Sequence, residues 1–164
     1  MILSACVLMT ALLLTGTLDD GRLDQRPSVA SPSRATATRA IAERTNAERR
    51  RAGLSTLKGN SRLERAAQIH ADQLARAARL AHDLPGARYP TLQDRLKAAG
   101  YAWRAIGENL ASGQTDAAAV IAAWMRSQGH RANILNPTFT ELGIGRAVDG
   151  SGRQYYVQVF GAPR

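Results

Sequence analysis

Apolar residues recur every three or four positions in four segments of the chain, which is the spacing of amphipathic helices. Residues that cap helices border these segments. Ser61 and Glu64 have capping-box spacing, Thr91 and Asp116 precede two later segments, and Gly100 follows one of them. The predicted helices cover residues 40–52, 61–82, 91–99 and 117–127.

The C-terminal part of the chain has the pattern of β-strands. Residues 154–160 are rich in β-branched and aromatic side chains, and residues 141–148 form a shorter, glycine-rich run. Asp149-Gly150-Ser151-Gly152 between them predicts a hairpin turn, and residues 101–106 favour a third strand. Helices followed by a small antiparallel sheet predict an α+β sandwich.

The first residues differ from the rest in character. The apolar run 2–14 is too short to span a membrane, which takes about 20 residues, and is typical of a signal peptide, although no Lys or Arg precedes it. Leu3-Ser4-Ala5-Cys6 is also similar to a lipoprotein box, so lipidation at Cys6 and a disordered start of a cytosolic protein stay open. The predicted organisation is a leader or anchor at 1–17, a flexible linker at 18–38 and one domain at 39–164.

The amino-acid composition limits the metal sites and the partners that the protein can have. The single cysteine excludes an intramolecular disulfide and any zinc site built on several thiolates. The net charge of +9 comes almost entirely from residues 41–164. It favours anionic neighbours such as phospholipid headgroups or acidic envelope polymers. Nucleic acid is not expected as a partner, because no basic and aromatic platform is visible.

Several short phrases occur in a shared order and spacing. They are Asn46-Ala47-Glu48-Arg49, His70-Ala71, His82, Gly107-Glu108-Asn109-Leu110-Ala111, Trp124 to Leu135, Phe139 to Gly145, and the closing Tyr155 to Gly161. Together they resemble the CAP superfamily of cysteine-rich secretory, antigen five and pathogenesis-related proteins, also called the SCP domain. The chain is most similar to the disulfide-free bacterial branch of that family.

The resemblance implies an α-β-α sandwich with a three-stranded antiparallel sheet between helical layers, and it implies export. It also implies a cleft lined by two histidines and two glutamates. By position, His82 and His130 match the histidines and Glu108 matches one glutamate, but Ser127 stands where the second glutamate falls. An activity that needs both carboxylates is therefore not expected.

The predicted site residues suit binding. Two imidazoles can hold Zn²⁺ or a similar divalent ion, with Glu108 either as a further ligand or as a carboxylate that orients one of the histidines. No cofactor is required, and the sequence lacks a His-Glu-x-x-His helix. We expect Ser127, Arg131 and Asn133 at the rim. The leading hypothesis is a binding module for a small amphipathic ligand, a lipid or a divalent ion.

Other functions stay open from the sequence. One is hydrolysis of cell-wall or peptide substrates by Glu108 with His82 or His130, and another is a structural envelope protein with a vestigial cleft. A Ser127–His130 dyad lacks the Gly-x-Ser-x-Gly elbow. A Glu108–Glu141 pair is disfavoured because Glu141 fits a surface position at a strand start. His70, Trp103 and Trp124 are expected in the core.

Overall fold

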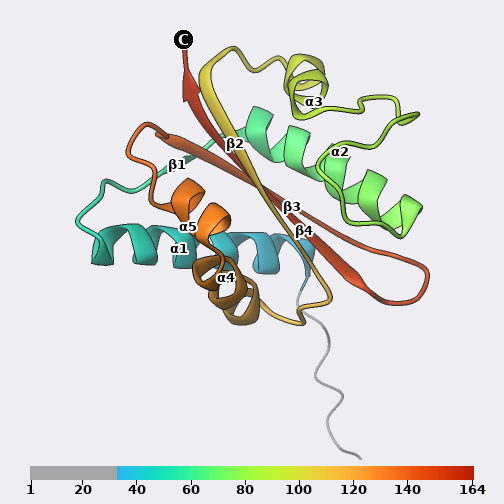
Figure 1. The fold of residues 1–164 in the computed structure, drawn as a ribbon, viewed down its shortest axis with the longest axis horizontal. Coiled ribbons are helices and arrows are strands. Elements are labelled where there is room, and N and C mark those ends of the chain that lie inside the picture. The colour runs from blue at the N-terminus through green and yellow to red at the C-terminus, as the bar shows by residue number, and fades with distance from the viewer. Residues whose placement is uncertain (1–32) are drawn as a thin grey trace, which may run out of the picture. The chain divides into compact units, whose positions relative to one another are not determined.

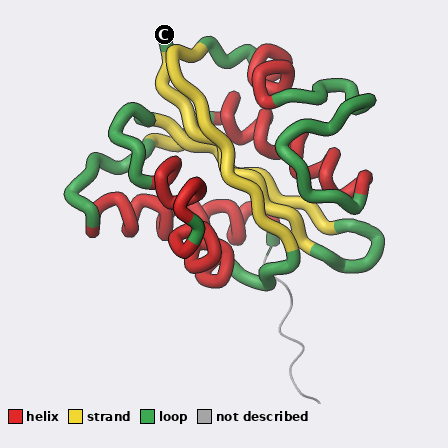
Figure 2. The backbone as a smooth tube through the Cα atoms, viewed as in Figure 1, coloured by secondary structure: helices red, strands yellow, loops and turns green. Residues whose placement is uncertain are grey.

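The computed structural model describes residues 33–164. A four-stranded sheet lies between two layers of helices (Figures 1 and 2). Helices α2 and α3 cover one face, and α1, α4 and α5 cover the other. The helices are α1 (Arg34–Arg51), α2 (Ser61–Ala77), α3 (Leu92–Ala99), α4 (Ala117–Arg126) and α5 (Gln128–Ile134). The strands are β1 (Lys58–Gly59), β2 (Trp103–Ser112), β3 (Glu141–Val148) and β4 (Gln154–Pro163).

The strand order is β1-β3-β4-β2, so the sheet places β2 at one edge. Strands β3 and β4 form the predicted antiparallel hairpin, and β2 pairs antiparallel with β4. The short β1 adds a parallel pairing to the start of β3. The predicted α+β sandwich is confirmed, but the sheet has four strands where three were expected, because two residues of the loop after α1 pair with β3.

Alternation along β4 separates two cores. Tyr155, Val157 and Val159 face α2 and α3, whereas Tyr156 and Phe160 face α1, α4 and α5. All five side chains are almost fully buried. A strand buried on both faces in this way holds the two helical layers in fixed positions on the sheet.

Helix α2 lies directly on β3. A Cβ atom at Gly143 would stand 2.2 Å from the backbone of Leu63 and Glu64, and one at Gly145 would stand 2.4 Å from the backbone of Ala67. Backbone-to-backbone packing this close is possible only without a side chain. Both glycines are therefore required where they stand.

The helix limits differ in part from the sequence prediction. Helix α1 begins at Arg34, where the Ser33 side chain accepts from the backbone N–H of Thr36, so residues 34–38 belong to this helix and not to the predicted linker. Helix α2 is capped by Asn60, with Ser61 as its first residue. The capping-box prediction at Ser61 is therefore wrong.

The predicted end of α2 and the extent of β2 also need correction. Helix α2 stops at Ala77 because Ala78 takes a left-handed conformation. Strand β2 extends to Ser112 and so contains the whole Gly107–Ala111 phrase. Helix α5 was not predicted, since its seven residues contain few apolar side chains.

Among the described residues, no helix is both long and apolar enough to cross a bilayer. The predicted leader, Cys6 and the linker up to residue 32 lie outside the described part of the chain.

Candidate functional site

Glu108 is the centre of a charged cluster on edge strand β2. Its side chain is only 4% exposed, and both carboxylate oxygens have partners. Oε1 lies 2.9 Å from His82 Nδ1, and Oε2 accepts a hydrogen bond of 2.9 Å from Arg95. The carboxylate therefore joins an exposed histidine to a buried cation.

Arg95 comes from α3 and is fully buried. Besides Glu108, its guanidinium donates to the carbonyls of His82 and Pro90, each at 3.2 Å. Burial lowers the pKa of Arg95, and the neighbouring Glu108 opposes that shift. The ion pair and the two carbonyl contacts fix the segment that carries His82 relative to β2.

His70 of α2 lies behind Glu108. It is fully buried, as expected for a core histidine, with Nε2 3.0 Å from the Ala81 carbonyl and 3.9 Å from Glu108 Oε1. Its Nδ1 lies 3.4 Å from Gln73 Oε1. Burial lowers the pKa of His70 and favours the neutral ring, while Glu108 acts in the opposite direction.

His82 has the opposite environment, because 59% of its side chain is exposed. The hydrogen bond to Glu108 raises the pKa of His82, and the charges of Glu108 and Asp83 add to this effect. The bond occupies Nδ1, so Nε2 is the ring nitrogen left to meet a ligand. A carboxylate that orients an imidazole in this way is the usual outer-shell arrangement of metal-binding histidines.

His130 approaches from the other helical layer, on α5. Its carbonyl accepts from Asn109 Nδ2 at 3.0 Å, and Asn133 Nδ2 donates to the Glu108 carbonyl at 3.2 Å. Burial lowers the pKa of His130, and the positive charge of nearby His82 contributes in the same direction. The outer edge of β2 is therefore flanked by His82 on one side and by His130 on the other.

A row of buried amides supports this edge. Asn109 Oδ1 accepts from Asn133 at 2.9 Å, Asn109 Nδ2 donates to Gln158 Oε1 at 3.0 Å, and Gln158 donates to Thr45 Oγ1 at 2.8 Å. Buried polar groups that are satisfied by one another hold a fixed geometry. Asn133, predicted at the rim, is thus part of the supporting network under Glu108.

The other predicted rim residues do not join the cluster. Ser127 lies between α4 and α5 and its side chain makes no capping hydrogen bond. Arg131 is exposed and lines a groove between these helices with Met125 and Leu135. Glu141 accepts a 2.7 Å hydrogen bond from Tyr101, which gives its carboxylate a partner other than Glu108.

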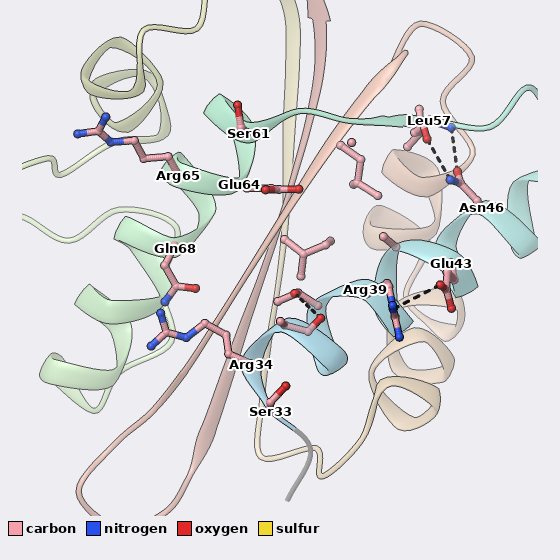
Figure 3. A pocket seen from close by; sticks show the side chains of 16 residues that line it. Ser33, Arg34, Arg39, Glu43, Asn46, Leu57, Ser61, Glu64, Arg65 and Gln68 are labelled. Carbon is pink, nitrogen blue, oxygen red and sulfur yellow. Dashed lines mark hydrogen bonds and ion pairs between the residues drawn. The ribbon is translucent and has the colours of Figure 1, made fainter.

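Five of the cavities on the described residues are lined by none of His82, Glu108 and His130. The largest, about 1070 Å³, lies between α1 and α2 above Leu142 and Ile144 of β3 (Figure 3). Apolar surface makes up more of its walls than polar surface, and Arg39 and Glu43 pair within it. Nothing in the sequence had pointed to this groove.

Sequence reasoning missed Arg95, although a signal existed. Leu92, Leu96 and Ala99 form the apolar stripe of α3, and Arg95 falls within that stripe at helical spacing. A charged residue on a buried helix face requires a partner of opposite charge. That requirement, applied to the stripe, would have indicated a buried carboxylate such as Glu108.

The sequence matches the cysteine-rich secretory protein (CAP) family over residues 42–160, and the chain belongs to this family. YkwD of Bacillus subtilis is 36% identical over 99 residues, which cover 60% of this chain and 38% of YkwD. The membrane protein YlbC of the same organism is 40% identical over 73 residues, which cover 44% of this chain and 20% of YlbC. The matched region thus spans well under half of either relative.

Solved structures agree with the fold. An extracellular SCP-domain protein of Bacillus anthracis superposes with a TM-score of 0.71 at 31% identity, covering 78% of this chain and 41% of that one. An outer surface protein of Borrelia burgdorferi gives a TM-score of 0.70 at 23% identity, covering 77% and 92%. These similar proteins are extracellular or on the cell surface.

Proposed function

We propose that this chain is an exported CAP-domain protein that acts as a binding module, with His82 and His130 as the anchors for a divalent ion at the outer edge of β2. One observation carries the proposal. Glu108 is buried and each of its oxygens has a partner, one of them His82 Nδ1, so Nε2 of this largely exposed imidazole is the nitrogen left for a ligand. That arrangement prepares an imidazole for coordination.

The residues fit a weak site and not a closed structural one. Among the described residues, no group of three or more histidine, cysteine or acidic side chains is placed to hold a metal. Two neutral imidazoles would supply the protein ligands, and water or a small molecule would complete the four positions that zinc prefers. An ion bound there would act as a Lewis acid toward whatever filled the open positions.

The same geometry disfavours the hydrolase alternative. A general acid or base must reach the proton it transfers, about 2.6–3.2 Å away or through one water. The Glu108 side chain is only 4% exposed, and its two oxygens already accept from His82 and Arg95, so the carboxylate is poorly placed to meet a substrate. A small amphipathic ligand or a lipid, also considered from the sequence, would need apolar space beside His82.

Calorimetric titration of the whole chain with ZnCl₂ tests the proposal. We expect binding in the wild type and loss of the binding heat in the His82→Ala/His130→Ala variant. Arg131→Ala is the matched control, because Arg131 is next to His130 but faces the α4–α5 groove. Equal heat in the wild type and the double variant would remove the metal from the proposal.

Two further measurements test export and the hydrolase alternative. Fractionation of a bacterial culture that expresses the full chain tests export, and recovery of the protein from the cytosol would contradict it. Turnover of peptidoglycan or casein that is lost in Glu108→Gln would instead restore the hydrolase alternative.

A further inference from the structure

We propose that the C-terminal end of α2 and the loop that follows it form a docking surface for the phosphate headgroups of an anionic lipid bilayer. The surface is defined by a cavity of about 560 Å³. Three arginines line the cavity, namely Arg76, Arg79 and Arg88. The other lining residues are Gln73, Ala77, Leu84, Pro85 and Ala87, so no carboxylate lines it.

The arginines of this surface have no ion-pair partner among residues 33–164. Arg76 also lines a neighbouring hollow with Asp72 and Asp149, whereas neither Arg79 nor Arg88 shares a hollow with a carboxylate. By contrast, Arg39 and Arg51 pair with glutamates on their own helix. Three exposed guanidinium groups around one hollow attract phosphate, which they can bind through paired N–H donors.

One apolar side chain, Leu84, lines the base of the cavity, and another, Leu80, lies in the same loop. Leu84 is buried beneath the cavity, while Leu80, at the outer side of the same turn, is 45% exposed. Leu80 is one of two large apolar side chains that the described residues leave exposed. Basic side chains around an exposed leucine suit the interface of a bilayer, where headgroups meet acyl chains.

The backbone fixes these side chains in place. Ala78 has φ of 47°, a conformation that non-glycine residues avoid at a cost of roughly 1 kcal/mol. This turn lets the Arg79 N–H bond to the Leu74 carbonyl at 3.2 Å, and Arg79 and Leu80, which follow it, are exposed. The Arg88 guanidinium lies over the Tyr89 ring, 5.3 Å from its centroid.

Two hydrogen bonds hold the loop after α2 in place. The Leu84 N–H bonds to the Pro90 carbonyl at 3.1 Å, and Gln73 donates to the Tyr89 carbonyl at 3.4 Å. The three arginines are therefore held on a preformed frame, which lowers the ordering cost of binding. The surface is separate from the proposed metal site, because neither His82 nor His130 lines it.

Vesicle co-sedimentation of the full chain tests this surface. One set of vesicles contains phosphatidylcholine and phosphatidylglycerol at 3:1, and the other contains phosphatidylcholine alone. We expect preference for the anionic vesicles and a loss of about 100-fold in their partition coefficient in Arg76→Gln/Arg79→Gln/Arg88→Gln, since each basic residue contributes about fivefold near such a membrane. The N-terminal segment is the same in every variant and cancels in the comparison.

A matched variant separates the surface from the overall charge. Arg44→Gln/Arg50→Gln/Arg104→Gln removes the same net charge from exposed positions outside the cavity, two of them on α1 in the opposite helical layer. We expect less than about a fivefold change, because screening limits the field of distant charges to about 10 Å. Equal losses in the two variants, or equal binding to both kinds of vesicle, would overturn the proposal.

A dye placed on the surface reports the contact directly. In a Cys6→Ser background, an environment-sensitive fluorophore at Leu80→Cys should shift to the blue with anionic vesicles, and one at Arg44→Cys should not. A shift only at residue 44 would show that another face meets the bilayer. Because the readout needs no metal, failure of this proposal and failure of the proposed metal site are distinguishable.

Discussion

Two arginines of the described residues, one on each side of the sheet, are at most 2% exposed, and they are held in opposite ways. Arg95, in the α2–α3 layer, pairs with the carboxylate of Glu108. Arg49, at the end of α1 in the other layer, is 2% exposed and meets only backbone carbonyls. Its acceptors are the carbonyls of Ser55, Ile134, Asn136 and Phe139.

The difference in partners distinguishes a structural arginine, Arg49, from an arginine that belongs to the candidate site, Arg95. Arg49 joins the end of α1 to the chain around α5, and its partners carry no charge that could serve chemistry. Arg95 holds a carboxylate whose other oxygen orients an exposed histidine. A buried cation therefore indicates a candidate site only when its partner also reaches a group at the surface.

The largest expected effect comes from breaking the charged pair. Arg95→Met leaves Glu108 buried without its cation, and we expect the free energy of unfolding to fall by about 3–5 kcal/mol. Chemical denaturation measures the change. Adding Glu108→Gln should recover part of the loss, because the uncompensated charge is gone. Additive losses in the double variant would contradict the coupling.

Arg49→Met should cost less, about 2–3 kcal/mol, since the carbonyls it leaves are neutral. The same denaturation experiment measures the loss. The comparison predicts that Arg49→Met leaves zinc titration and the pKa of His82 unchanged, whereas Arg95→Met alters both. If both variants changed the zinc titration and the pKa of His82 equally, the distinction between a structural role for Arg49 and a site role for Arg95 would be wrong.

The smallest effect is the dependence of stability on pH, measured without metal in the presence of EDTA. The folded state raises the pKa of His82 through Glu108, so the stabilisation that His82 contributes is complete below about pH 6.5 and is lost as pH rises through the folded pKa. Burial lowers the pKa of His70, so its contribution is present above about pH 6.5 and is lost as pH falls.

The two histidines thus oppose each other around one carboxylate. In His82→Asn, the contributions of His70 and His130 remain and both are lost as pH falls, so stability should fall more steeply below about pH 6.5 than in the wild type. In His70→Gln, stability should fall less steeply than in the wild type, because the raised pKa of His82 then opposes only the lowered pKa of His130. Thermal unfolding between pH 5 and 8 measures both slopes, and parallel curves for the two variants would contradict the assignment.

Much of the fold could be predicted because its signals are local. The apolar stripe of α2, the Thr91 cap and Gly100 stop of α3, and the alternation of β4 each depend on neighbours within a few residues. Strand β1 and helix α5 could not be predicted in this way. Strand β1 consists of two residues that pair only because β3 lies beside them. Helix α5 has too few apolar side chains to show the helical repeat of apolar positions.

In the candidate site, too, some residues could be predicted from the sequence and others could not. The resemblance to the CAP family assigned His82, Glu108 and His130 by position, and the contact between His82 and Glu108 follows from the fold. Arg131 was expected at the rim of the cleft, but it lines another groove although it is next to His130 in the sequence. Neighbours along a helix lie about 100° apart around its axis, so closeness in sequence does not place them on one face.

Motif order in the sequence indicated the family and, through that resemblance, the helical layers on both faces of the sheet, while composition excluded intramolecular disulfides and determined the positive charge. Only the tertiary structure decided which oxygen of Glu108 meets which partner, and that three arginines surround one hollow without a carboxylate. The physical reason is distance along the chain. Glu108 is 26 residues from His82, and contacts of that range are set by how the helices pack on the sheet.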